Sequence, residues 1–317
     1  MRPVLVRFDA PLLGDVALPS YFTMLALGFA VALVLTWRDA RRQGLAPGRV
    51  VDLNLHAVLW GLVGARMLHL IADGQIGVYV ATCRAPETLR VLPGVTCTRD
   101  AQCAGPRGES GYRCNRRAGH CHPPRDCLLA LKLWRGGLSY YGGFIAAALA
   151  WLLLIRRWRL PRDRVLDLAG YGLPLGLCFG RIGCFLNGCC YGAMTGSAWG
   201  VTFPPGGVVA RDHASIPMLG HFAPLPVHPT QLYSAVANLA IFVVCYFVVR
   251  PRKRRDGQVL WTFVALYAVS RFAIEFLRAD PRGALLGLST SQLLSVPLLA
   301  LALFALFRPA ARGEAAR

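Results

Sequence analysis

The sequence predicts an all-α polytopic membrane protein of about seven transmembrane helices, with a small disulfide-rich outer insertion. The 317 residues are 55% hydrophobic and only 16% charged, which is more apolar surface than one soluble core of this size usually contains. The hydrophobic residues are grouped in runs close to the roughly 20 residues that cross a hydrocarbon core. Short segments rich in arginine separate these runs, a pattern that is hard to obtain from a soluble fold.

Seven apolar runs are long enough to be membrane spans. They lie at residues 21–37, 51–72, 136–155, 165–186, 229–249, 259–277 and 289–307. We expect segment 1–72 to hold the first two spans and segment 73–134 to be a cysteine-rich insertion outside the membrane. Segment 135–317 should then add the remaining five spans to the same bundle.

The connecting segments predict the orientation. Basic residues concentrate at 38–49, 156–164, 250–255 and 308–317, which all fall on one side of the predicted membrane. Because cytoplasmic loops carry an excess of Lys and Arg, this side should be the cytoplasm, with the N-terminus outside and the C-terminus inside. The net charge of +19 then reflects orientation and an arginine-rich composition, and no nucleic-acid partner is needed.

The long connection between the second and third runs should lie outside, and its cysteines agree with this. An even set of six in a stretch rich in Gly, Pro and Arg is typical of a disulfide module in an oxidising compartment. These six are Cys83, Cys97, Cys103, Cys114, Cys121 and Cys127. Their pairing stays open, because the sequence does not choose among the possible connectivities. A zinc site is the alternative, since His120 and His122 flank Cys121, but the spacing of common zinc modules is absent.

Charged residues inside the apolar runs are the main candidates for function, because each is costly at membrane depth unless paired or facing a wet cavity. Arg66 lies in the second run and Arg181 in the fourth. In the sixth run Arg271 and Glu275 are four residues apart and share one helix face, which Arg278 extends. A structural ion pair between helices is one interpretation. Several arginines for one carboxylate favour a bound anion instead, and a lipid phosphate is the natural one.

Four glycines lie close to Arg181 in the sequence, within the fourth run or just after it: Gly180, Gly183, Gly188 and Gly192. Such residues let backbone approach a ligand or interrupt a helix, although close packing of helices through small residues is the alternative. Asn187 lies in the same stretch and is a candidate to orient a head group.

Two further motifs open predicted spans. The third span begins with Gly136-Gly-Leu-Ser-Tyr-Tyr141-Gly-Gly143, whose tyrosines are interfacial anchors or, in the case of Tyr141, face a cavity. The fifth begins with His228-Pro-Thr-Gln231-Leu-Tyr233. A histidine at such an edge often has only an interfacial role, but its pKa range also suits proton transfer.

Taken in order, these motifs resemble those of the prolipoprotein diacylglyceryl transferase family, which consists of seven-helix bacterial inner-membrane enzymes. The resemblance is carried by Gly64-Ala-Arg66, Gly136-Gly-Leu-Ser139 with Gly142-Gly143, Gly180-Arg-Ile-Gly183, Phe185-Leu-Asn187-Gly188 with Gly192, His228-Pro-Thr-Gln-Leu-Tyr233 and Arg271-Phe-Ala-Ile-Glu275-Phe-Leu-Arg278. It covers most of the chain apart from the cysteine-rich insertion and segment 193–227.

The resemblance implies transfer of a diacylglyceryl group from phosphatidylglycerol to the lipobox cysteine thiol of preprolipoproteins, with release of glycerol phosphate. It implies these two substrates and membrane lipid as partners, the bacterial inner membrane as the location, and neither a metal nor an organic cofactor. Arg181 and Arg271 would hold the phosphate or stabilise its departing charge, while Glu275 would orient an arginine. Tyr141 is the remaining catalytic candidate. The substrate-binding candidates are Tyr21, Arg66, Gly142, Gly143, Gly183, Asn187, Gly192, His228, Gln231 and Arg278.

The chain departs from the family pattern near these candidates. Tyr141 replaces a histidine that is a proposed base, and a phenol is a poor base near neutral pH unless a cation lowers its pKa. Cys184 replaces an asparagine, Cys189 a glutamate, and Ser234 a common glutamate. Two alternatives therefore stay open. One is a catalytically altered or silent relative that binds anionic phospholipid and a periplasmic partner, and the other is a membrane thiol oxidoreductase that uses Cys184, Cys189 and Cys190.

Overall fold

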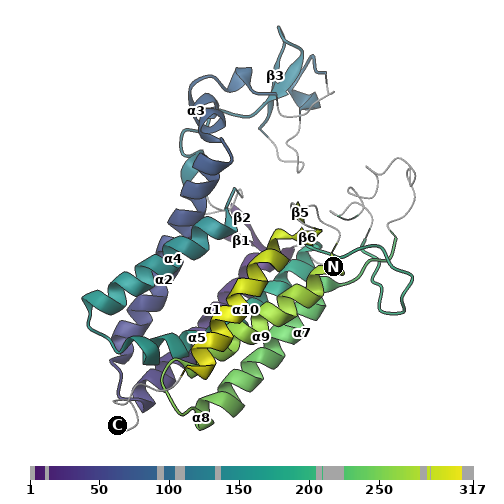
Figure 1. The fold of residues 1–317 in the computed structure, drawn as a ribbon. Coiled ribbons are helices and arrows are strands. Elements are labelled where there is room, and N and C mark those ends of the chain that lie inside the picture. Colours follow the sequence, from purple (N-terminus) through teal and green to yellow (C-terminus); the bar gives the residue numbers. More distant parts are fainter. Residues whose placement is uncertain are drawn as a thin grey trace. The chain divides into compact units, whose positions relative to one another are not determined.

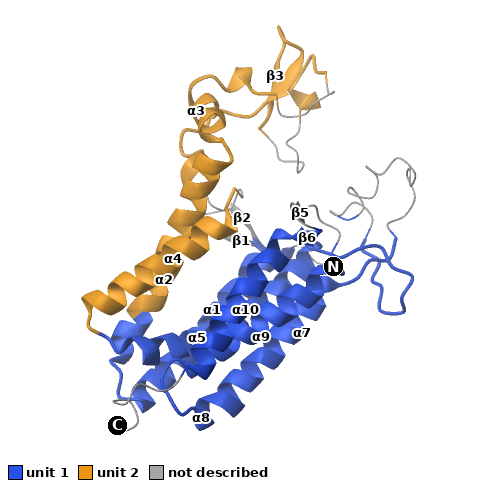
Figure 2. Ribbon diagram, viewed as in Figure 1, with its two compact units in different colours: residues 1–51, 160–317 blue, residues 52–159 orange. Residues whose placement is uncertain are grey.

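The structure, a computed structural model, describes residues 4–10, 14–90, 96–103, 111–132, 137–204, 209, 225–278, 284–285 and 287–308. Figure 1 labels its helices and strands. Compact packing divides the chain into two units (Figure 2): unit 1 comprises Met1–Val51 and Leu160–Arg317, and unit 2 comprises Asp52–Arg159.

Unit 1 is a helical bundle. Its helices are α1 (Ser20–Arg42), α5 (Arg162–Asn187), α7 (Thr230–Val243), α8 (Arg250–Arg252), α9 (Gln258–Glu275) and α10 (Thr290–Phe307), with the π-helical segment Val244–Val249 joining α7 to α8. Helix α5 packs against α1, α7 and α9, and α10 packs on α9. In the most apolar part of α5, 44% of the residues are buried, against 17% in α1 and α10. The fourth predicted run therefore forms the centre of this bundle.

Short antiparallel hairpins precede α1 and α10. β1 (Val4–Ala10) pairs with β2 (Gly14–Pro19), and β5 (Ala284–Leu285) pairs with β6 (Leu288–Ser289). Ser289 then starts α10 with a reciprocal cap, because its hydroxyl accepts the N–H of Gln292 and the Gln292 side chain accepts the N–H of Ser289. The apolar pattern of the sequence does not predict these hairpins.

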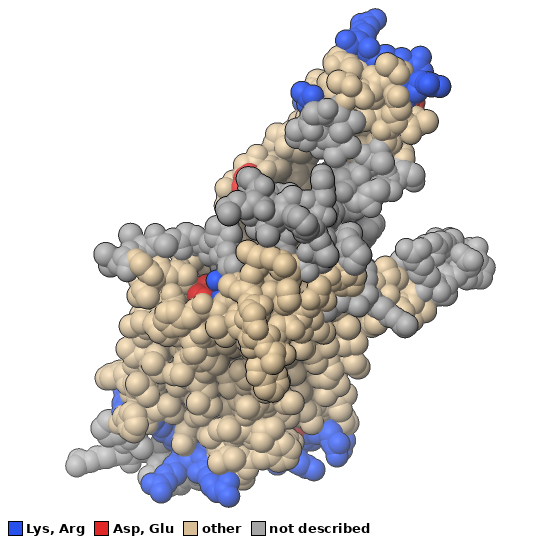
Figure 3. Space-filling model, turned by 90° about the vertical axis from the view of Figure 1, so that its right-hand side faces the viewer, with Lys and Arg blue, Asp and Glu red and all other residues tan. Residues whose placement is uncertain are grey.

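Two buried carboxylates bind basic side chains at the end of unit 1 where Lys and Arg residues are concentrated, which we call the basic end. Asp39, which is fully buried, accepts hydrogen bonds from the Tyr171 hydroxyl at 2.8 Å and from Arg250 at 2.7 Å. Asp167 accepts Lys253 Nζ at 2.8 Å and three backbone N–H groups at the start of α9 at 2.9 to 3.2 Å. Lys and Arg side chains gather at the lower end of the space-filling view (Figure 3). The predicted cluster of cations is thus partly neutralised from within the protein.

Unit 2 contains two long helices that cross through small residues. They are α2 (Pro47–Ala72), most of which belongs to this unit, and α4 (Tyr140–Arg157). A Cβ at Gly143 of α4 would lie 3.1 Å from the carbonyl oxygen of Gly61 in α2, and a Cβ at Gly142 would collide with the carbonyl oxygen of Gly64. Gly142 and Gly143 therefore serve close helix packing in this unit, and their expected part in substrate binding stays a prediction.

Three disulfides hold the insertion between these helices together, as the six cysteines predict. They join Cys83 to Cys127, Cys97 to Cys114 and Cys103 to Cys121. The insertion contains α3 (Ile76–Arg84), the paired strands β3 (Arg113–Asn115) and β4 (His120–His122), and the short 3₁₀ turns Pro86–Thr88, Asp100–Gln102 and Leu129–Leu131.

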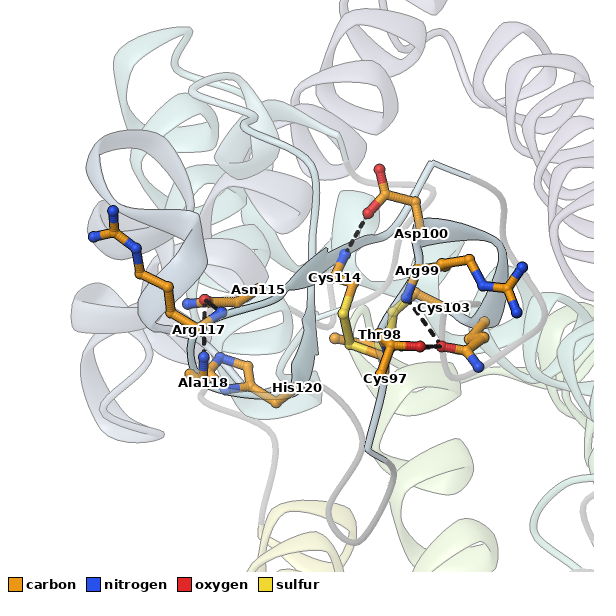
Figure 4. The surroundings of a disulfide bond; sticks show 12 residues. Cys97, Thr98, Arg99, Asp100, Cys103, Cys114, Asn115, Arg117, Ala118 and His120 are labelled. Carbon is orange, nitrogen blue, oxygen red and sulfur yellow. Dashed lines mark hydrogen bonds between the residues drawn. A yellow bond between two sulfur atoms is a disulfide. The ribbon is translucent and has the colours of Figure 1, made fainter.

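The two disulfides around β3 and β4 form the buried core of this insertion, with Tyr112 packed against it. Figure 4 shows the surroundings of the disulfide between Cys97 and Cys114. Asp100 supports them by accepting the backbone N–H of Cys114 at 2.9 Å. The zinc alternative finds no support here, because these cysteines are paired. His120 and His122 each form a hydrogen bond with a backbone carbonyl group, at 3.1 Å and 2.9 Å.

Each of the seven predicted apolar runs overlaps a helix in the described part of the chain, although Gly136 lies outside the described residues. Among the residues that the structure describes, five helices are long and apolar enough to cross a membrane: Ser20–Arg42, Pro47–Ala72, Arg162–Asn187, Thr230–Arg252 and Thr290–Phe307. Helices α4 and α9 are not among these five. The helical membrane class is supported, whereas seven spans, their orientation and the division at residues 72 and 134 stay predictions.

Candidate functional site

A recess in unit 1 lies between α5, α7 and α9. Its lining comprises Leu177 and Arg181 of α5, Ser234 and Asn238 of α7, and Tyr267, Ser270, Arg271 and Ile274 of α9. Arg181 and Arg271, which the sequence places in separate apolar runs, therefore meet at one site. The recess combines two guanidinium groups with hydroxyl and amide groups inside an apolar bundle.

Positive charge exceeds negative charge at this recess. Arg271 Nη1 lies 2.7 Å from Glu275 Oε2, and Arg271 Nη2 donates to the Ser291 hydroxyl of α10 at 2.9 Å. The Glu275 side chain is buried, at 5% exposure, and that of Arg271 is largely shielded, at 13%. Within the described part of the chain, Arg181 forms no ion pair with a carboxylate. One carboxylate beside two arginines leaves a cationic site that suits an anion.

Asn238 is a recess residue that the sequence analysis missed. Its amide donates to the Ser234 carbonyl at 2.7 Å, while its buried Oδ1 has no hydrogen-bond partner among the described residues. A buried acceptor without a partner costs on the order of 1–3 kcal/mol, so a ligand or water that donates a hydrogen bond is expected there. The signal in the sequence was an amide in the middle of the fifth apolar run.

The segment after α5 is joined to the start of α7 by backbone and side-chain hydrogen bonds. Gly192 donates its N–H to the His228 carbonyl at 2.9 Å, and the fully buried Gln231 donates to the Cys189 carbonyl at 2.8 Å. A Cβ at Gly192 would come within 2.9 Å of His228 Cβ, so this close approach requires glycine. Three predicted residues thus share one contact region.

Tyr21 joins the same part of unit 1 from α1. A Cβ at Gly183 would lie 3.1 Å from Tyr21 Cα, which makes this glycine a close-packing position between α1 and α5. The Tyr21 phenol is within electrostatic reach of Arg181 and of the cysteines after it. Asn187 is exposed as the last residue of α5. Arg278 lies just after α9, within electrostatic reach of Arg271.

The other predicted site residues belong to unit 2. Arg66 is 6% exposed and donates to four backbone carbonyls, those of Leu129, Ala130, Lys132 and Gly137, at 2.8 to 3.3 Å. It also donates to the Tyr79 hydroxyl at 2.8 Å. These bonds satisfy much of the hydrogen-bonding capacity of the buried guanidinium, and its expected contact with substrate stays a prediction. Tyr141 is 51% exposed at the start of α4, with its ring beside that of Tyr140.

The sequence profile of the prolipoprotein diacylglyceryl transferase family matches residues 10–93 and 117–308, which leaves out part of the cysteine-rich insertion. The chain belongs to this family. The resemblance inferred from the motifs is thereby confirmed.

Three relatives illustrate the extent of the similarity, and each is named a phosphatidylglycerol–prolipoprotein diacylglyceryl transferase. The protein of Geobacter sulfurreducens is 36% identical, over 92% of this chain and 90% of its own length. The protein of Clostridium tetani is 27% identical over 96% of both chains. The protein of Allorhizobium ampelinum is 36% identical over 59% of this chain, and there the chain spans only 62% of the relative's length.

Proposed function

We propose that this protein transfers the diacylglyceryl group of phosphatidylglycerol to the lipobox cysteine thiol of preprolipoproteins and releases glycerol phosphate. The observation that carries this proposal is the recess lined by both Arg181 and Arg271, with Glu275 as the carboxylate beside them. The names of the relatives state the same donor and acceptor for those proteins.

The residues of the recess suit the chemistry of this transfer. The acceptor sulfur attacks the glyceryl carbon, so a C–S bond forms while the C–O bond to the phosphate breaks. Arg181 and Arg271 would bind the phosphate and stabilise the charge that the leaving group acquires. Glu275 would hold the guanidinium of Arg271 in position through its 2.7 Å ion pair. The thiol must lose its proton first, because the thiolate is the nucleophile.

The membrane arrangement is part of the proposal. The chain would cross the bacterial inner membrane seven times, with its N-terminus outside and its C-terminus in the cytoplasm. Five helices of sufficient length and hydropathy support this, as do the basic residues of α8 and the start of α5. The three disulfides of the insertion support an oxidising outer location for it.

The direct test uses purified protein in phosphatidylglycerol vesicles with a lipobox peptide. Mass spectrometry should detect a peptide that gains one diacylglyceryl group, and a peptide with serine in place of the cysteine should gain none. Arg271→Lys should lose most of this activity, because lysine cannot bind a phosphate bidentately. Arg38→Lys, at an exposed position of α1, is the matched control. Product formation by Arg271→Lys at the wild-type rate would contradict the proposed role of the recess.

A second candidate function is lipid binding without transfer. It is favoured by Tyr141, which replaces the family histidine and is half exposed in unit 2. Lipid retention and product formation should be measured on the same sample. Binding of phosphatidylglycerol without product from any cysteine-containing peptide would support this candidate instead.

A further inference from the structure

Three free cysteines converge at the C-terminal end of α5. The Sγ atoms of Cys184, Cys189 and Cys190 all lie within 4.8 Å of one another, and none of the three is in a disulfide. The resemblance to the family gives no role for this cluster, because cysteine replaces the family's asparagine at Cys184 and its glutamate at Cys189. In the insertion of unit 2, by contrast, all six cysteines are paired.

The backbone after α5 is folded so that these thiols meet. Gly188 ends the helix in the left-handed region with φ 77°, and the N–H of Cys189 returns to the Cys184 carbonyl at 3.1 Å. Cys190 also has a positive φ, 63°, which costs a residue with a Cβ about 1 kcal/mol and tends to mark functional positions.

Side chains of α7 fix this conformation from the opposite side. Thr230 donates to the Cys190 carbonyl at 3.0 Å, and Gln231 donates to the Cys189 carbonyl at 2.8 Å. The two carbonyl groups that flank the second and third thiols are therefore held in place. The three sulfur atoms are preorganised as a group rather than brought near one another by a loose loop.

We propose that Cys184, Cys189 and Cys190 bind a Zn²⁺ ion and that the fourth coordination position of this ion takes the acceptor thiol. This inference rests on the proposed function. A tetrahedral zinc ion with Zn–S bonds of about 2.3 Å requires sulfur atoms roughly 3.8 Å apart, which lies within the separation observed here. Three protein ligands with one open position is the arrangement of catalytic zinc, whereas structural sites have four.

The charges around the cluster agree with a zinc–thiolate centre. Three thiolates and one Zn²⁺ carry a net charge of about −1, and a fourth thiolate brings it to about −2. Arg181 and Arg278 lie within electrostatic reach of Cys190, so cations are present to balance this charge. Soft thiolate ligands also select zinc over the hard cations magnesium and calcium.

Zinc would supply the activation that this chain lacks at Tyr141. A thiol that coordinates zinc loses its proton, here to water. The bound sulfur then attacks the glyceryl carbon, and the electron pair of the broken C–O bond leaves with glycerol phosphate. The reaction needs no oxidant, because no net electrons are transferred. The neutral thioether that forms is a weaker ligand than the thiolate, so the product leaves the metal.

The test begins with the metal content of the full-length protein purified without chelator. Elemental analysis should find one zinc ion per chain in the wild-type protein, and Cys184→Ala, Cys189→Ala and Cys190→Ala should each lose it. Cys178→Ala and Cys245→Ala are the matched controls, because these are buried free cysteines of unit 1 outside the cluster, and both should retain zinc. A wild-type protein without zinc, a disulfide within the cluster, or zinc retained by all three variants would overturn the proposal.

Cobalt substitution tests the open position independently of turnover. The Co²⁺ protein should have a thiolate-to-metal charge-transfer band, which a lipobox peptide with cysteine shifts and its serine analogue does not. Equal spectra with both peptides would overturn the acceptor role. Transfer at the full rate by metal-free protein would overturn the role of zinc in activating the acceptor thiol and leave the proposed function intact. A cysteine-specific shift without any product would support the site and count against the proposed function.

Discussion

Arginine and cysteine occur in both units of this protein, and the two units use them differently. In unit 2, Arg66 donates to four carbonyls and a phenol, and the six cysteines of the insertion form three disulfides. In unit 1, Arg181 lines a recess without a carboxylate partner among the described residues, and Cys184, Cys189 and Cys190 remain thiols. A residue's position in an apolar run does not separate these cases. The difference is whether the side chain already has bonding partners within the protein, as Arg66 and the paired cysteines do.

The largest expected effect is that of replacing Arg181, which tests whether this arginine serves activity rather than stability. We expect Arg181→Gln to lower the transfer rate by about 10²–10³, the usual effect of losing one group that stabilises transition-state charge. The amount of folded protein should stay near that of the wild type, because no described carboxylate is left without a partner. The measurement is the initial rate with a lipobox peptide, normalised to folded protein. Arg38→Gln serves as the control. An equal loss of transfer rate in both variants would show that Arg181 has no special role in activity.

Removal of Arg66 should act on stability instead. Arg66→Ala removes the donor of four partly buried hydrogen bonds to carbonyls and of one to the Tyr79 hydroxyl, which together should cost about 3 kcal/mol or more. Limited proteolysis should then cleave unit 2 faster than in the wild type. Arg84→Ala in α3, whose side chain is exposed, provides the comparison within the same unit. If Arg66→Ala resists proteolysis as well as Arg84→Ala does, the hydrogen bonds of Arg66 do not stabilise unit 2.

The cysteines of the two units can be compared in the same way, with smaller expected effects on stability. The double variant Cys103→Ala/Cys121→Ala opens a loop with a sequence separation of 18 residues, which should destabilise the insertion by about 2–3 kcal/mol. Cys178→Ala in α5 removes only a buried thiol and should have a smaller effect. Chemical denaturation followed by a probe in each unit would measure both. Equal losses would mean that the disulfide contributes no more than ordinary packing.

The smallest expected effect is a pH dependence at the basic end of unit 1. Partial burial by itself would raise the pKa of Asp256, but hydrogen bonds from Lys253 and Arg164 outweigh it and hold the pKa below its ordinary value. A carboxyl with a lowered pKa stabilises the folded state above its unfolded value of about 4, and this stabilisation is lost as the pH falls through the folded pKa.

The melting temperature of Asp256→Asn should therefore lie below that of the wild type at neutral pH, and the difference should shrink in acid. A difference that stays constant from pH 7 to below about pH 4 would show that the charge of Asp256 is not responsible.

The sequence predicted the helices well, because the length of an apolar run limits the length of the helix that can bury it. The run at 165–186 corresponds to α5 (Arg162–Asn187), and that at 289–307 corresponds to α10 (Thr290–Phe307). The π-helical segment at Val244–Val249 was not predicted, since a change in backbone hydrogen bonding leaves no mark in an apolar run.

The candidate site was predicted only in part. The surplus of arginine over carboxylate could be counted along the chain, but the meeting of Arg181 and Arg271 depends on how α5 and α9 pack. Asn238 was missed because a single amide in an apolar run does not reveal which face of the helix it occupies. The sequence places Arg66 with the arginines expected to bind lipid, because its carbonyl partners lie more than sixty residues away in the chain.

Asp167 acts on the recess from the opposite end of the bundle. By accepting the first N–H groups of α9, it determines the residue at which that helix starts. Arg271 lies twelve residues beyond Val259, or roughly 18 Å along the helix axis. A slip of one residue at the start would turn every later side chain by about 100° and direct the Arg271 guanidinium away from α5. A carboxylate at the basic end thus sets the helical register that brings Arg271 to the recess.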